Sequence, residues 1–154
     1  MKIAVITCSD TRVREDDTAG NALEELIVGA GWTCVLREIV ADDRALIAEA
    51  IVAACEQEVD IVITCGGTGL SARDVTPEAT QDVCERMVPG IAEGMRAYSL
   101  TITNRAMLSR AVCMQRGKTL VINFPGSEKA ARENWEAVSG VLEHAVFMMA
   151  GGGH

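Results

Sequence analysis

The sequence predicts an α/β fold, in which a mostly parallel sheet carries helices on both faces and forms three layers. Apolar, β-branched stretches alternate along the chain with stretches of helical period, the order that builds βαβ units. One of the strand stretches, Ile61-Val62-Ile63, is apolar throughout, which is typical of strands buried on both faces. We expect a single domain over residues 1–150 and a frayed tail at 151–154.

The expected elements follow from these patterns. The strands are rich in β-branched residues and cover 3–7, 33–40, 61–64, 111–114 and 119–123. The helices keep apolar residues on one face and cover 21–28, 43–58, 77–87, 91–98 and 128–149. Capping residues precede three of them: Asp42 or Asp43, Thr76 ahead of Pro77, and Ser127.

Composition and charge restrict the class of protein. With 14 Lys and Arg against 22 Asp and Glu, the formal charge of -8 argues against general nucleic-acid binding, which needs a basic surface. Six cysteines without a CxxC pair, and only two histidines, argue against a zinc site and favour reduced thiols. Neither a signal peptide nor an apolar run of membrane-spanning length is recognisable. We therefore expect a cytoplasmic protein that contacts no membrane.

The run from Thr64 to Glu78 is the most informative stretch of the chain. Its glycines, between a strand and a helix, allow a sharp turn and bring bare N–H groups close to a ligand. Such donors and a helix N-terminus favour anions such as phosphate, and Arg73 adds charged donors. Asp74 would repel a phosphate unless a metal ion or a proton transfer explains it. The run predicts a site for a phosphorylated ligand with Mg²⁺ nearby; the alternative is a purely structural glycine turn.

In parallel sheets the ligand crevice lies outside the carboxyl ends of the strands. The segments expected there are 9–12, 41–43, 66–74 and 123–127, and they should gather into one pocket. Asp42 and Asp74 would then lie together, where two carboxylates can hold Mg²⁺ on a triphosphate or orient a nucleophile. Each segment also has a structural interpretation, as a turn or a helix cap. Residues 15–17 are expected to form a solvated acidic loop.

With these residues placed, the chain resembles the molybdenum cofactor biosynthesis proteins of the Mog/MoaB type, the molybdopterin adenylyltransferases. The resemblance covers nearly all of the chain. It rests on Ser9-Asp10-Thr11-Arg12, Asp17 to Gly20, Asp42-Asp43, Gly66 to Gly69 with Arg73 to Ala79, Leu108 to Ala111, and Asn123 to Ala130. The chain departs from the common pattern at Ala19, where Ser is frequent, and at Ala41, where Pro is frequent.

The resemblance implies Mg²⁺- and ATP-dependent adenylylation of molybdopterin, giving adenylyl-molybdopterin and pyrophosphate, by a homotrimer or a dimer of trimers. Asp42 and Asp74 match the two aspartates that matter for catalysis, and would hold Mg²⁺. Residues expected to bind nucleotide or pterin phosphate are Ser9, Asp10, Gly66, Gly67, Thr68, Gly69, Arg73, Thr76, Ser109, Arg110, Pro125, Gly126 and Ser127. A contact with the molybdenum-insertion enzyme is also expected. The alternatives are a non-catalytic molybdopterin-binding or delivery protein of the same fold, and a nucleotide hydrolase.

Overall fold

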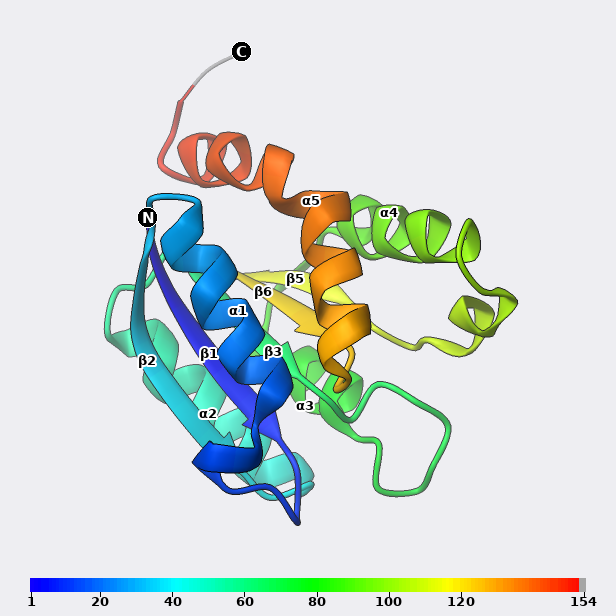
Figure 1. Cartoon of the computed structure of the whole chain (residues 1–154). Helices are drawn as coiled ribbons and strands as arrows, with labels where there is room; N and C mark the ends of the chain where they lie inside the picture. Colours follow the sequence, from blue (N-terminus) through cyan, green and yellow to red (C-terminus); the bar gives the residue numbers. More distant parts are fainter. Residues whose placement is uncertain (153–154) are drawn as a thin grey trace.

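The computed structural model describes residues 1–152, which contain one six-stranded sheet in the order β2-β1-β3-β6-β5-β4 (Figure 1). The first four strands in this order are mutually parallel. In sequence, the strands are β1 (Lys2–Cys8), β2 (Thr33–Val40), β3 (Ile61–Cys65), β4 (Arg86–Met87), β5 (Cys113–Arg116) and β6 (Thr119–Phe124). The last two pairings, β6 with β5 and β5 with β4, are antiparallel. The mostly parallel sheet is thereby confirmed.

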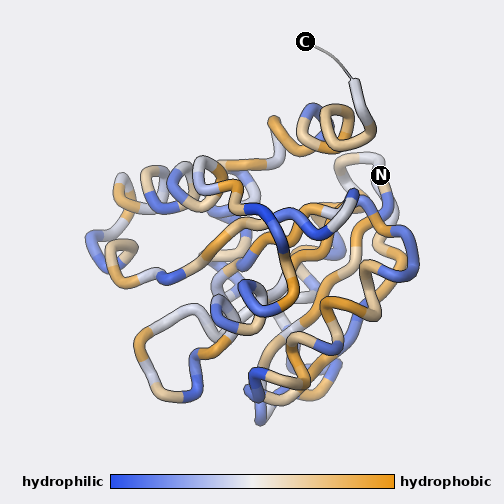
Figure 2. The backbone as a smooth tube through the Cα atoms, turned by 180° about the vertical axis from the view of Figure 1, so that it is seen from behind, coloured by the Kyte–Doolittle hydropathy of each residue, from blue (hydrophilic) through white to orange (hydrophobic). Residues whose placement is uncertain are grey.

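Helices cover both faces of the sheet, as expected for three layers. One face carries α1 (Thr18–Gly29), α4 (Pro89–Leu100) and α5 (Glu128–Met149), which lie in front in Figure 1. The other face carries α2 (Arg44–Glu56) and α3 (Thr76–Val83), and Figure 2 shows it from behind. Two short 3-10 turns, η1 (Arg14–Asp16) and η2 (Asn104–Leu108), precede α1 and follow α4. Within residues 1–152 no helix has the length and apolarity that a membrane crossing requires.

The core has two parts, one on each side of the sheet. Ile3 and Val5 belong to the cluster that also contains Leu23 of α1 and Leu142 of α5. Ala4 and Ile6 belong to the other cluster, together with Ile47 of α2. Because successive side chains of a strand point to opposite faces, a strand between two helical layers is apolar at every position. This is why β1 and β3 read as continuous apolar runs.

The predicted helix over 77–87 is wrong in its second half. The helix α3 ends at Val83, and the chain then joins the antiparallel edge of the sheet. The Glu85 amide donates to the Gln115 carbonyl at 3.1 Å, and the Val88 amide donates to the Cys113 carbonyl at 2.8 Å. Both residues of β4 have exposed side chains, so the strand is defined by its partner and not by an apolar pattern.

Other boundaries shift because of local hydrogen bonds. The helix α1 begins at Thr18 instead of residue 21, because the Asp17 side chain caps it by accepting from the Gly20 amide. The strand expected at 111–114 runs over Cys113–Arg116. Of the expected tail, the Gly151 and Gly152 amides donate to α5 carbonyls at 3.0 Å, and 153–154 lie outside the described residues.

Candidate functional site

Four loops meet at the carboxyl ends of the parallel strands, as predicted. The Ser9 amide donates to the Val40 carbonyl at 2.9 Å, which joins the loops after β1 and β2. The Gly66 amide donates to the Phe124 carbonyl at 3.0 Å, which joins the loops after β3 and β6. The loop over 66–75, green in Figure 1, extends away from the sheet at this edge. We call this edge the rim.

The glycine turn is packed so closely that it excludes side chains. Gly66 has a φ of +106°, and a Cβ there would lie 2.6 Å from the Cys8 carbonyl oxygen. Gly67 has a φ of +67°, and a Cβ there would collide with the Thr76 hydroxyl. A Cβ on Gly126 would lie 3.1 Å from the Gly66 Cα. The first glycines therefore bring the ends of β1, β3 and β6 together by direct main-chain contact.

Thr76 does not cap α3, contrary to the sequence-based expectation. It is the first helical residue, the N-cap is Val75, and no side chain caps this end. Thr76 is fully buried, and its hydroxyl has no hydrogen-bond partner within the described part of the chain. Since it lies against Gly67, Thr76 supports the turn and offers a ligand no exposed surface.

The aspartates at the rim are tied to one another. The Asp10 amide donates to Asp42 Oδ2 at 3.2 Å, and the Asp42 amide donates to Asp10 Oδ1 at 3.0 Å. Partial burial raises the pKa of Asp42, and the negative charge of Asp74 raises it further. The two predicted carboxylates are thus brought close enough to repel each other.

The neighbouring Asp43 takes the capping role that the sequence left open between two residues. Its carboxylate accepts from the Ala45 amide at 2.9 Å and from the Leu46 amide at 3.0 Å. The side chain of Asp42 is therefore not needed for α2 and lies at the rim instead.

The Asp74 carboxylate has a defined orientation. Its Oδ2 accepts from the Ser71 amide at 2.8 Å, and it packs on Gly69, where a Cβ would lie 3.0 Å from Oδ2. The neighbouring Arg73 reaches across the rim and forms an ion pair with Asp10. Arg73 remains the most exposed of these groups, with 68% of its side chain accessible.

Arg110 is held by the protein itself. Its Nε donates to the Gly69 carbonyl at 2.7 Å, and its terminal nitrogens donate to the Asp74 carbonyl and pair with Glu78. The hydrogen bonds from Arg110 lower the pKa of Glu78. Sequence reasoning expected Arg110 to contact a ligand, but could not identify main-chain carbonyls as its acceptors.

The remaining predicted residues stand around the same loops. Ser127 caps α5 by accepting from the Ala130 amide at 3.3 Å, as the structural interpretation suggested. Ser9 accepts from the Thr11 and Arg12 amides at 3.4 and 3.3 Å, so its loop is a local turn that also reaches the rim. Pro125 accepts a hydrogen bond from the Cys65 thiol at 3.2 Å.

A cavity of about 280 Å³ lies beside the glycine loop, between α4, η2 and α5. Four of the predicted ligand residues line it: Thr68, Gly69, Ser109 and Pro125. Sequence reasoning missed the others, which include Met95, Arg96 and Asn134, because a helix turns each toward the cavity and no motif marks them. A larger cavity of about 480 Å³, lined by Asp60 and Arg116 among others, lies at the opposite edge of the sheet and holds none of the predicted residues.

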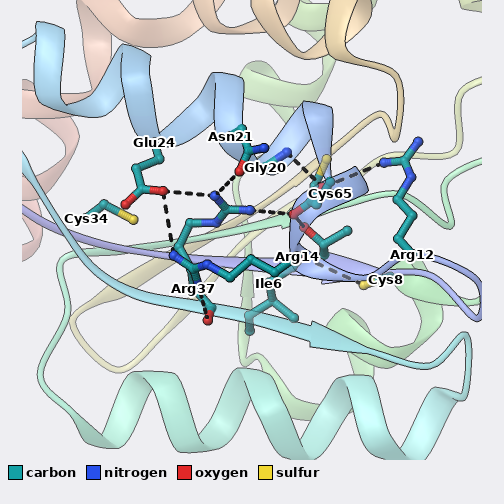
Figure 3. A network of polar contacts seen from close by, with 12 residues as sticks. Ile6, Cys8, Arg12, Arg14, Gly20, Asn21, Glu24, Cys34, Arg37 and Cys65 are labelled. Carbon is teal, nitrogen blue, oxygen red and sulfur yellow. Dashed lines mark hydrogen bonds and ion pairs between the residues drawn. The ribbon is translucent and has the colours of Figure 1, made fainter.

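Residues 15–17 are not a uniformly solvated loop, because Asp17 is fully buried. Its carboxylate accepts from the Thr7 hydroxyl at 2.7 Å and from the Arg37 guanidinium at 2.6 Å. Figure 3 shows Arg37 reaching Asn21 and Glu24, with Arg12 approaching from the other side. Sequence reasoning began this helix at residue 21 and so missed Asp17 as the cap of α1, and the partner Arg37 lies 20 residues further along the chain, in β2.

The six cysteines are free thiols. Two of them, Cys8 and Cys65, end their strands at the rim and are buried. Burial raises the pKa of each to about 12, so the thiolate is scarce near neutral pH and neither group is suited to act as a nucleophile.

Residues 4–144 match the family model described as "Probable molybdopterin binding domain". Molybdopterin adenylyltransferase of Helicobacter pylori is 39% identical to this chain, over 97% of the chain and 88% of its own length. Molybdenum cofactor biosynthesis protein B of Escherichia coli is 37% identical, over 89% of this chain and 82% of its own.

Solved structures agree with these relatives. A crystal structure of molybdenum cofactor biosynthesis protein B has a TM-score of 0.93 at 36% identity, and covers 97% of this chain and 96% of its own. The molybdopterin biosynthesis enzyme MoaB of Thermus thermophilus has a TM-score of 0.89 at 41% identity, with coverage of 97% and 96%. The chain thus belongs to the molybdopterin-binding domain family of the molybdenum cofactor biosynthesis proteins.

Proposed function

We propose that this protein transfers an adenylyl group from ATP to molybdopterin, giving adenylyl-molybdopterin and pyrophosphate. The observation that carries the proposal is the gathering of acidic and basic groups at the rim beside the glycine turn. Asp10 exchanges hydrogen bonds with Asp42 and forms an ion pair with Arg73, and the Asp74 carboxylate packs on Gly69. This gathering occurs in a chain that is 39% identical to a protein named molybdopterin adenylyltransferase.

Asp42 and Asp74 fit a magnesium ion that is shared with a substrate. The residues described contain no cluster of three or more acidic, histidine or cysteine side chains suited to a metal. Mg²⁺ typically takes one or two carboxylates and completes its shell with water and substrate phosphates, so two aspartates suffice. Partial burial and the negative charge of Asp74 both raise the pKa of Asp42, and a cation between the two carboxylates would offset that charge. When bound, the ion neutralises charge on the phosphates.

In the reaction a phosphate oxygen of the pterin attacks the α-phosphorus of ATP, and the bond to the pyrophosphate oxygen breaks. The main-chain amides of Gly67, Thr68 and Gly69 and the first turn of α3 supply fixed dipoles toward the reacting phosphates. Gly126 and Ser127, at the start of α5, supply the N-terminus of a second helix in the same role. The protein's main contribution is to hold the two phosphates in line.

The cavity beside the glycine loop suits the pterin ring. Met95 and Leu108 give it apolar walls, and Asn134 gives it a polar amide, a combination typical of sites for flat heterocycles. The cavity reaches Thr68, Gly69 and Pro125, so a phosphate attached to the ring would extend toward the rim. Ser109 adds a hydroxyl on the way.

Arg73 and Asp10 would contact the triphosphate side. The Arg73 side chain is largely exposed, and its guanidinium forms an ion pair with Asp10. A phosphate would compete with Asp10 for it, since Arg binds phosphate bidentately. Ser9 lies on the same loop as Asp10 and completes this side of the site.

The competing function is that of a non-catalytic protein that binds and delivers molybdopterin, which the family description alone would also fit. One assay separates the two. Purified protein is incubated with molybdopterin, ATP and Mg²⁺, and adenylyl-pterin and pyrophosphate are measured with each component omitted in turn.

Product that requires every component supports the transferase. Pterin binding without product supports delivery, and ATP loss without pterin indicates a hydrolase. Asp43→Asn serves as a matched control, because Asp43 is acidic and adjacent to Asp42 but caps α2.

We also expect a trimer or a dimer of trimers in the cytoplasm. Exposed apolar side chains gather at the end of α4 and in η2, namely Leu100, Ile102, Met107 and Leu108, and such a patch is typical of an interaction surface. Analytical ultracentrifugation would measure the state of assembly. A transfer of product to the molybdenum-insertion enzyme would take place at the nearby rim.

A further inference from the structure

Within the loop that carries Asp74 the hydrogen bonds are local, such as those from the Ser71 amide to the Asp74 carboxylate and from the Asp74 amide to the Ser71 carbonyl. Residues 66–75 contain neither helix nor strand, and the loop extends away from the sheet (Figure 1). Leu70 is 66% exposed at its tip. If Asp74 takes part in the reaction, something must hold it to within a fraction of an ångström, because misplacement by 1 Å costs a large part of the rate.

One guanidinium from a distant segment connects two positions of this loop, Gly69 and Asp74. Nε of Arg110 donates to the Gly69 carbonyl at 2.7 Å, while Nη2 donates to the carbonyl of Asp74. Gly69 is also the residue on which the Asp74 carboxylate packs. Arg110 thus holds the residue that carries the carboxylate and the surface beneath it.

The same guanidinium is anchored to the helix that follows. Nη1 of Arg110 pairs with Glu78 in the first turn of α3. The main chain adds a further link, since the Arg110 amide donates to the Thr68 carbonyl at 3.0 Å. The three nitrogens of one planar group therefore have three separate acceptors, a geometry that a lysine, with its single charged nitrogen, cannot reproduce.

We propose that Arg110, anchored by Glu78, is a positioning residue that fixes the Asp74 carboxylate at the rim, and that it does not bind a substrate phosphate. This inference rests on the proposed function, because it assigns Asp74 to the reaction. It changes the role that the sequence suggested for Arg110 from ligand contact to support of the loop.

Arg44 provides a matched control. It forms a two-point ion pair with Asp82, with both N–O distances at 2.6 Å, and Asp82 lies on the same helix as Glu78. Arg44 therefore has the same residue type and the same kind of partner, but it has no contact with the loop carbonyls among its hydrogen bonds.

The kinetic test compares Arg110→Lys, Arg110→Met and Arg44→Met in steady-state adenylylation. Both Arg110 variants should lose about 10²-fold in kcat, with little change in KM for ATP and molybdopterin. Arg44→Met should match the unmodified protein. A raised KM with kcat retained would show that Arg110 binds a substrate, and full kcat in Arg110→Lys would show that charge alone is required. Either result overturns the proposal.

A second measurement is independent of turnover. Amide hydrogen exchange of residues 68–75 in the ligand-free protein should be faster in both Arg110 variants and unchanged in Arg44→Met. Unchanged exchange in the Arg110 variants would overturn the proposed support. If the unmodified protein forms no adenylyl-pterin, the proposed function fails, while faster exchange still supports the role of Arg110 in holding the loop.

Glu78→Gln guards against a folding defect in the Arg110 variants. The amide keeps the size and the hydrogen-bonding capacity of the side chain but removes the charge that anchors Arg110. It should lower kcat less than the Arg110 variants do and speed the exchange of the same amides. Exchange as slow as in the unmodified protein, with normal kcat, would remove Glu78 from the proposal.

Discussion

Two aspartate–arginine groups lie next to the carboxyl end of β1. They differ in the exposure of their side chains and in the number of hydrogen bonds that these side chains form with other residues of the protein. Asp17 and Arg37 have 0% and 5% of their side chains exposed. The Asp17 carboxylate accepts from Thr7, Gly20 and Arg37, and Arg37 also reaches Asn21 and Glu24. Asp10 and Arg73 have 26% and 68% exposed, and the nearby Asp42 and Asp74 carry further negative charge.

The same residue types therefore have different roles in the two groups. A buried pair whose atoms all have partners holds α1 against β2, and leaves no charge for a ligand. At the rim, Asp10, Asp42 and Asp74 lie near Arg73, and the pKa of Asp42 is raised, first by its partial burial and then by the negative charge of Asp74. Perturbed carboxylates in an accessible place are typical of functional sites, whereas paired, buried ones are typical of structural networks.

The largest effect on stability should come from the buried group of Asp17 and Arg37. Asp17→Asn leaves the buried Arg37 with the partly exposed Glu24 as its remaining charged partner, and breaking a buried pair costs about 3–5 kcal/mol in the free energy of unfolding. Urea-induced unfolding would measure it. Asp16→Asn, at an exposed neighbour, should leave the unfolding curve unchanged. An Asp17→Asn protein as stable as its parent would show that the burial of this group contributes nothing.

A change in the exposed group at the rim should affect turnover and not stability. Asp74→Asn should lower turnover by about 10²–10³ with the urea midpoint unchanged, because an asparagine oxygen still accepts from the Ser71 amide. Single-turnover adenylylation and unfolding would be measured on the same preparation. If Asp74→Asn destabilises the fold as much as Asp17→Asn, the distinction between the two groups fails. Normal turnover would remove Asp74 from the mechanism.

The pH dependence of Asp42 is a smaller and more specific test. Burial and Asp74 raise its pKa above the ordinary value of about 3.9, so the folded state binds this proton more tightly than the unfolded chain. The contribution of Asp42 to stability therefore decreases as the pH rises from the unfolded pKa to the folded one. Carbon-13 NMR titration should show the Asp42 pKa falling in Asp74→Asn; an unmoved pKa would contradict the proximity of the two carboxylates.

The smallest effect separates two adjacent residues. Asp43→Ala removes the cap of α2 and should cost about 1 kcal/mol in unfolding free energy, with turnover retained. Thermal unfolding and the adenylylation assay measure the two quantities. Loss of turnover without loss of stability would mean that Asp43, and not only Asp42, serves the rim.

Sequence patterns predicted what depends on neighbouring residues or on the sheet as a whole. The alternation of strands and helices indicated a parallel sheet. The rule that ligand crevices lie at the carboxyl ends of parallel strands predicted that Asp42 and Asp74 lie on the same side of the sheet. The patterns failed where a partner lies far along the chain. Asp17 looked solvated because Arg37 is 20 residues away, and β4 was invisible because only its hydrogen bonds to β5 define it.

Arg110 illustrates a third kind of limit. Its residue type and its place in a motif indicated a ligand contact, but two of its three acceptors are main-chain carbonyls, which every residue has and which no sequence distinguishes. Thr76 is similar, because the pattern of a threonine before a proline indicates a cap, whereas α3 already begins at Thr76, whose side chain is buried against Gly67.

The direct contact of Gly66 with Gly126 sets the tolerance of the whole site to change. The two turns touch through main-chain atoms, so their separation is inherited from the spacing of β3 and β6, which adjacent strands keep at about 4.8 Å. That distance depends neither on a side-chain rotamer nor on a particular core residue. A chain with this sheet could replace much of its interior and still keep these two turns at the same separation, provided that both positions stay free of a side chain.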